Sequence, residues 1–149
     1  MTEGYRLHQS LLYQLTLTSR LQERRLDEGL RQHGLTRLTW CVLLALHVER
    51  LTRPSEIAEF IGIDRTAISR ALRQMEAAGW IARSGGTTDR RTTRVETTPE
   101  GAALCERATP VAEENARHFL SKLPEGGARA LQELMARLRE GEARNLPRF

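Results

Sequence analysis

Cysteine is scarce in this chain of 149 residues, and its two copies, Cys41 and Cys105, lie far apart. Two isolated cysteines cannot build a disulfide framework or a four-ligand zinc site. The four histidines show no short spacing typical of a metal site, and no nucleophile stands near a candidate base. Gly85-Gly86 also lacks the flanking residues of a phosphate-binding loop. We therefore expect a protein that is not an enzyme and carries no metal or cofactor.

Long apolar runs are absent as well. No segment approaches the roughly 20 apolar residues that span a bilayer, and the beginning of the chain lacks the apolar segment of a signal peptide. We expect a cytoplasmic protein with no membrane partner. A hydrophobic content of 40% in 149 residues suits one domain with appended oligomerisation helices.

Lysine is nearly missing: Lys122 is the single copy, and the other 22 basic residues are arginine. Between positions 65 and 94, seven arginines are opposed by Glu76 and Asp89 alone, which leaves a local net charge of +5. An arginine-rich patch of this kind suits a polyanion, and DNA is the obvious candidate.

The segment 54–81 has the pattern of a helix-turn-helix. Ile57, Ala58 and Ile61 recur at helical spacing, and Gly62 is a typical residue for ending a helix. Asp64 is a suitable N-cap for a second helix over about 65–78. Its apolar residues fall on one side and its arginines mostly on the other, which is typical of a recognition helix.

A short β-hairpin is expected directly after this helix. Residues 80–83 and 92–97 are strand candidates, and the residues between them have turn chemistry. A basic hairpin that follows a recognition helix is called a wing.

Helices are expected at both ends of the chain. A long helix is predicted over about 5–31, and its length of roughly 40 Å is too great for one face to pack inside a small domain. Thr36 is a plausible cap for a second, almost wholly apolar helix that should lie at the centre of the core. Two more helices are predicted, one from Thr98-Pro99-Glu100 towards Leu120 with a kink at Pro110, the other over about 125–143.

The fold class is therefore mainly α with a small β-hairpin wing (α+β), one intertwined domain. We expect a winged helix-turn-helix over 35–98, and a helical dimerisation region built from 1–34 and 99–149.

This order of elements resembles the MarR family of bacterial transcriptional regulators. Local matches carry the resemblance: Leu35-Thr36 with Trp40, the helix-turn-helix residues 65–70, Asp89-Arg90-Arg91 in the wing, and Thr98-Pro99-Glu100-Gly101 after it. The resemblance implies a homodimer that binds a pseudo-palindromic DNA operator, and a repressor that a small, often aromatic, ligand releases.

DNA contacts are expected from the recognition helix and, by resemblance, from the wing. The candidate DNA-binding residues are Arg65, Thr66, Ser69, Arg70, Arg73, Asp89, Arg90 and Arg91. Exposed arginines can contact guanine or phosphate in a bidentate manner.

A ligand pocket is implied between the dimerisation helices and the winged region. Its candidate lining residues are His33, Arg37, Trp40 and His47. Two alternatives stay open: a winged-helix protein-interaction module without DNA binding, and a regulator that senses oxidants through Cys41 or Cys105.

Overall fold

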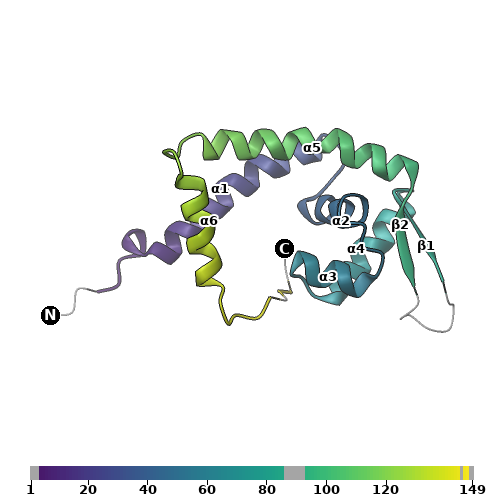
Figure 1. The fold of residues 1–149 in the computed structure, drawn as a ribbon, viewed down its shortest axis with the longest axis horizontal. Helices are drawn as coiled ribbons and strands as arrows, with labels where there is room; N and C mark the ends of the chain where they lie inside the picture. Colours follow the sequence, from purple (N-terminus) through teal and green to yellow (C-terminus); the bar gives the residue numbers. More distant parts are fainter. Residues whose placement is uncertain (1–3, 86–92, 145, 148–149) are drawn as a thin grey trace.

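The structure is a computed structural model that describes residues 4–85, 93–144 and 146–147. Its elements, in chain order, are the 3₁₀-helix η1 (Leu7–Gln9), α1 (Leu11–Arg31), α2 (Arg37–His47), α3 (Pro54–Ile61), α4 (Arg65–Ala77), β1 (Ile81–Ser84), β2 (Arg94–Thr97), α5 (Pro99–Leu120) and α6 (Gly127–Leu138). Helix α5 lies along α1, and α2, α3 and α4 gather beside this pair with the hairpin at their far end (Figure 1). The expected class, mainly α with a small β-hairpin, is confirmed.

The helix starts follow from side chains that cap them. The hydroxyl of Thr36 accepts a hydrogen bond from the backbone N–H of Thr39, whose own hydroxyl accepts from the N–H of Thr36. Thr98 caps α5 by accepting from the N–H of Gly101, with Pro99 in the first turn. Each cap satisfies a donor that the first helical turn leaves without an intrahelical partner.

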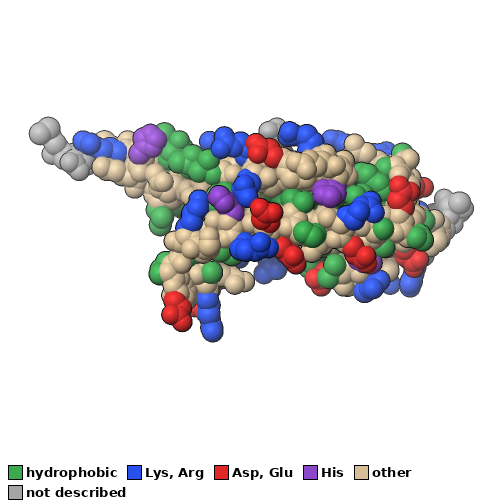
Figure 2. All heavy atoms as spheres, turned by 90° about the horizontal axis from the view of Figure 1, so that it is seen from above, with side chains coloured by type: hydrophobic (Ala, Val, Ile, Leu, Met, Phe, Trp, Pro, Cys, Tyr) green, Lys and Arg blue, Asp and Glu red, His purple; other side chains and the backbone are tan. Residues whose placement is uncertain are grey.

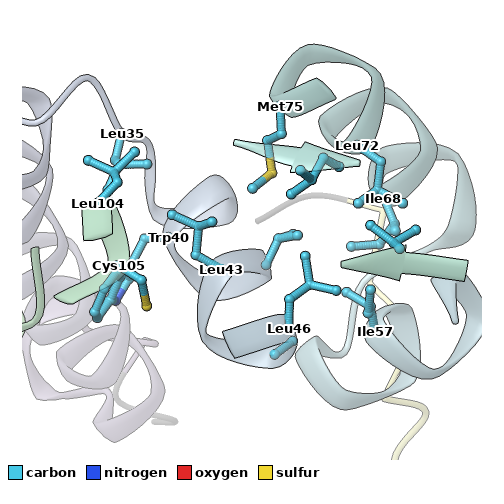
Figure 3. Packing of buried hydrophobic residues seen from close by; sticks show 14 of the residues in the cluster. Leu35, Trp40, Leu43, Leu46, Ile57, Ile68, Leu72, Met75, Leu104 and Cys105 are labelled. Atoms are coloured by element: carbon cyan, nitrogen blue, oxygen red, sulfur yellow. The ribbon is translucent and has the colours of Figure 1, made fainter. Parts of the chain in front are cut away.

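Helix α2 forms the centre of the hydrophobic core. Trp40, Val42, Leu43, Ala45 and Leu46 are all buried, as the apolar pattern predicts. In Figure 3, Trp40 faces Leu104 and Cys105 of α5, while Leu43 and Leu46 lie on the side of α3 and α4. One core therefore joins the helix-turn-helix to α1 and α5.

The terminal helices expose much apolar surface. Leu11 and Leu12 of α1 are exposed, as are Leu131, Leu134 and Leu138 of α6. Hydrophobic side chains gather at the N-terminal end of the molecule in Figure 2. In α6, all of which the structure describes, no residue is buried.

Two of the predicted helices are longer than the helices in the structure. The helix expected over 5–31 is interrupted at Ser10, whose extended backbone separates η1 from α1 and whose hydroxyl caps α1. The last helix ends at Leu138 rather than near 143, because Gly141 has a φ of +78°, which the right-handed helix cannot accommodate. Helix α5 runs through Pro110 as one helix.

Candidate nucleic-acid interface

The recognition helix α4 separates its side chains cleanly by face. Asp64 caps it, its carboxylate accepting from the N–H of Ala67 at 2.8 Å. Its inner side is buried in the core through Ile68, Ala71, Leu72 and Met75. The exposed residues on its outer side, which we call the α4 outer face, are Arg65, Thr66, Ser69, Arg70 and Arg73.

The turn between α3 and α4 fixes the direction of this face. Gly62 ends α3 in the left-handed conformation, with φ of +83°, and donates its N–H to the carbonyl of Ala58. Ile63 follows it and is only 2% exposed, so the turn is anchored in the core. Glycine is favoured at this position because a side chain would strain the left-handed backbone.

The arginines of the α4 outer face are available for a polyanion. Among the residues that the structure describes, Arg65, Arg70 and Arg73 form no ion pair. Arg65 also lies in the first turn, where the helix dipole adds positive potential. This face can thus contact phosphates and base edges without first breaking an ion pair to any other described residue.

The stem of the wing is an antiparallel pair of strands. Ile81 pairs with Thr97 and Ser84 pairs with Arg94, with Ile81 and Val95 buried against the core. The backbone N–H of Val95 also donates to the carbonyl of Thr52, at 2.8 Å, which ties the stem to the segment before α3. The strands begin later than predicted in both cases. The predicted wing residues Asp89, Arg90 and Arg91 lie outside the described residues.

One arginine of the basic stretch is already paired. Arg83 on β1 donates from Nε to the Oε2 atom of Glu76 on α4, at 2.7 Å. Of the seven arginines in this stretch, Arg83 is therefore neutralised by Glu76, whose charge the net value of +5 already includes. Sequence reasoning missed this pair, since the separation of seven residues across a turn gives no periodic signal.

The four candidate ligand-pocket residues have different surroundings, and His33 is half-buried in the turn after α1. Trp40 is buried in the core, at 5% exposure. The guanidinium of Arg37 forms ion pairs with Glu23 and Asp27 of α1, at 2.9 and 2.7 Å. His47 lies 3.3 Å from Glu106 of α5, measured from Nε2 to Oε1.

A charged hollow of about 240 Å³ lies between α1 and α2. Of the four candidates, Arg37 alone is among its lining residues, with Arg20, Glu23, Arg24, Asp27, Glu28 and Arg31 as the others. The remaining three, His33, Trp40 and His47, do not line this hollow. The structure therefore does not gather the four residues around it.

A second, mainly apolar cleft of about 300 Å³ lies between α2 and α3 and was not predicted. It is lined by Cys41, Leu44, Val48, Glu49, Phe60 and Ile61. Burial raises the pKa of the Cys41 thiol to about 11, against a smaller opposing effect of Arg37. The thiol is therefore protonated near neutral pH and behaves as a small apolar group.

Other classes of site find no support in the described part of the chain. It contains no group of three histidine, cysteine or acidic side chains placed to hold a metal ion. Among its helices, none combines the length and the apolar character needed to cross a membrane.

Comparison with known proteins points to one family. A sequence profile described as the MarR family matches residues 33–92. The multiple antibiotic resistance protein MarR of Salmonella typhimurium is 29% identical over 91 residues, which are 61% of this chain and 63% of that protein. The chain thus spans less than two thirds of that relative. The transcriptional regulator PecS of Dickeya dadantii is 29% identical over 127 residues, 83% of this chain and 76% of PecS.

A solved structure has a similar fold. BpsR from Bordetella bronchiseptica, in a structure that addresses regulation of its DNA binding by 6-hydroxynicotinic acid, matches with a TM-score of 0.83 at 21% identity. The match covers 93% of this chain and 99% of that one. The helix-turn-helix, the hairpin stem and the flanking helices correspond in order to the elements expected from the sequence. The chain belongs to the MarR family of winged-helix transcriptional regulators.

Proposed function

We propose that this protein is a dimeric, sequence-specific DNA-binding transcriptional regulator, a repressor that a small ligand releases. The observation that carries the proposal is the α4 outer face. It presents three arginines without ion pairs among the described residues, beside two hydroxyl side chains, on a helix whose inner side is locked in the core. This is the composition that base and phosphate contacts require.

The roles on this helix divide by position. Thr66, Ser69, Arg70 and Arg73 would face base edges in a major groove, while Arg65 at the helix N-terminus would bind a phosphate. Asp89, Arg90 and Arg91 of the wing would act in the adjacent minor groove. That assignment follows from the family and not from the described residues.

Dimerisation would use both ends of the chain, residues 1–34 and 99–149. The support is the exposed apolar surface of α1 and α6: six leucines on these helices are exposed. Monomeric proteins seldom expose large apolar patches, so leucines exposed together on two helices are typical of an interaction surface. A two-fold dimer would place two recognition helices on a pseudo-palindromic operator, with half-sites about one helical turn, roughly 10 bp, apart.

An effector would bind near the junction of the terminal helices and the winged region. Arg37 faces a hollow there, and a ligand carboxylate would have to compete with Glu23 and Asp27 for its guanidinium. The regulation of BpsR by 6-hydroxynicotinic acid supports an aromatic acid as the first class to screen. Trp40 would act through packing, because it is buried in the core.

The test is fluorescence anisotropy with DNA from the protein's own upstream region and with scrambled DNA, over a series of salt concentrations. We expect tighter binding to the upstream DNA. We also expect log K to fall with log salt at a slope of about −5 to −9, since a dimer would contact roughly 6–10 phosphates. Absence of binding to either DNA at low salt would contradict the proposal and favour a protein-interaction module. If both DNAs bound alike, the claim of a specific site in the upstream region would fail.

A further inference from the structure

The end of the chain returns to the helix-turn-helix. The backbone N–H of Leu146 donates to the carbonyl of Gly62, and the N–H of Asp64 donates to the carbonyl of Leu146, both at 3.0 Å. Ile63 and Leu146 thereby form a parallel β-bridge. After leaving α6, the chain runs back to the region of α3 (Figure 1). We call residues 142–144 and 146 the C-terminal strap.

The strap lies very close to the turn. A side chain at Gly62 would place its Cβ about 3.0 Å from the carbonyl oxygen of Arg144. That separation is shorter than an ordinary carbon–oxygen contact, so the strap and a larger residue could not share this space without movement. Two features therefore favour glycine at position 62: its left-handed φ and the strap backbone that lies over it.

The residue that the strap holds is the cap of the recognition helix. The Asp64 side chain accepts from the N–H of Ala67 in the first turn of α4, while its own N–H is bound by Leu146. Within the described part of the chain, the Asp64 N–H has no other partner. The strap thus connects α6 to the point at which the recognition helix begins.

We propose that the C-terminal strap positions the recognition helix, and that Leu146 is the positioning residue. This inference rests on the proposed function. Because no residue of α6 is buried within its own chain, the partner subunit would set where α6 lies. The strap would then transmit the position of α6 to the N-terminus of α4, so that dimer geometry and operator recognition are coupled.

Two substitutions at one position separate the backbone role from the side chain. Leu146→Pro removes the N–H that binds Gly62, whereas Leu146→Ala keeps both backbone hydrogen bonds. The Leu146 side chain is 58% exposed, so neither change removes core packing. The readouts are hydrogen exchange at the Asp64 amide, and the dissociation constants for upstream and scrambled DNA.

For Leu146→Pro we expect faster exchange at Asp64 and roughly three- to ten-fold weaker binding to upstream DNA, the loss that one or two backbone hydrogen bonds produce. Binding to scrambled DNA should change less, because phosphate contacts tolerate small shifts of the helix better than base contacts do. Leu146→Ala should match the original protein in all three measurements. A merely structural role for the strap would not change the ratio of the two affinities.

The inference and the proposed function fail in different ways. An original protein that binds DNA, together with unchanged DNA affinities in Leu146→Pro, would overturn the inference and leave the function standing. Equal exchange rates at Asp64 in the two proteins would overturn it as well, because the strap contact would then be absent in solution. If the original protein bound no DNA, the proposed function would fail, and the positioning role with it.

Discussion

Arg83 of the wing stem and Glu76 of the recognition helix are joined by an ion pair, with 2.7 Å between Nε and Oε2. The side chains are 30% and 48% exposed, so water screens the attraction only in part. The pair links the C-terminal half of α4 to β1, the first strand of the wing stem. Arg83 is therefore better regarded as a brace of the wing than as a free DNA-binding cation.

The energetic coupling between Glu76 and Arg83 can be measured with a double-mutant cycle. Glu76→Gln and Arg83→Gln should each destabilise the protein slightly, and the double variant should lose less than their sum. We expect a coupling of about 0.2–1 kcal/mol in the free energy of unfolding from urea titrations, the usual range for a partly exposed pair. Strictly additive effects would mean that the pair contributes nothing in solution.

Helix α6 supplies the test of dimerisation. Leu134→Glu introduces a charge at position 134, where the leucine is 58% exposed in a single chain. A monomer would tolerate this change, whereas a dimer that buries α6 would dissociate, because an unpaired charge is costly in an apolar interface. Sedimentation velocity should show a monomer for this variant and a dimer for the original chain.

The matched control for that experiment is Val48→Glu, since Val48 is also 58% exposed but lies outside the terminal helices. We expect this variant to remain dimeric. Dissociation of both variants would indicate that the interface extends beyond the proposed region, and dissociation of neither would remove α6 from it.

The thiols provide a test of the redox alternative. Burial raises the pKa of Cys41 to about 11 from an ordinary 9.0, and burial also raises the pKa of Cys105. Two units correspond to roughly a hundred-fold lower thiolate fraction at neutral pH. Iodoacetamide should therefore label Cys41 about a hundred times more slowly in the folded protein than in urea, as followed by mass spectrometry.

The sign of the pH effect follows from the same shift. The folded state binds the Cys41 proton more tightly than the unfolded state, so this contribution to stability is present below pH 9 and is lost as the pH rises towards 11. Labelling of Cys41 at the rate of a free thiol would contradict the buried environment and favour a redox sensor.

Gly101 marks the junction of the wing with α5. An added Cβ there would overlap the backbone carbonyl of Trp80, which accepts a hydrogen bond from the N–H of Thr98. We expect Gly101→Ala to cost about 1–3 kcal/mol of stability, as overpacking commonly does. Gly4→Ala is the control, because none of the residues that the structure describes lies within 4 Å of its added Cβ. Equal denaturant midpoints for the two variants would show that the junction can relax.

The sequence predicts this fold well where local chemistry decides the structure. Helix α3 ends at Gly62, as the left-handed preference of glycine predicts. The N-caps of α2, α4 and α5 are Thr36, Asp64 and Thr98, as their capping side chains predict. The burial of Ile68, Leu72 and Met75 follows directly from helical periodicity. These features depend on neighbours within a few residues, and a single sequence contains that information.

Features that depend on distant residues were missed. One local feature was missed as well: the interruption at Ser10 was hidden by leucines that continue the helical pattern on both sides of it. The engagement of Arg37 by Glu23 and Asp27, and the contact of Leu146 with the turn, join segments that only the tertiary fold brings together. The DNA contacts and the ligand pocket stay predictions, since they involve partners beyond this chain.

The α4 outer face is proposed to contact the bases of the operator, and Arg70→Ala tests this proposal most directly. The measurement compares the affinity for upstream and scrambled DNA of this variant with that of Arg107→Ala, which removes an exposed arginine from α5. We expect Arg70→Ala to lose about 1–3 kcal/mol of affinity for the upstream DNA and much of the discrimination, and Arg107→Ala to lose neither. Upstream affinity that does not change in Arg70→Ala, or that falls equally in both variants, would contradict the account.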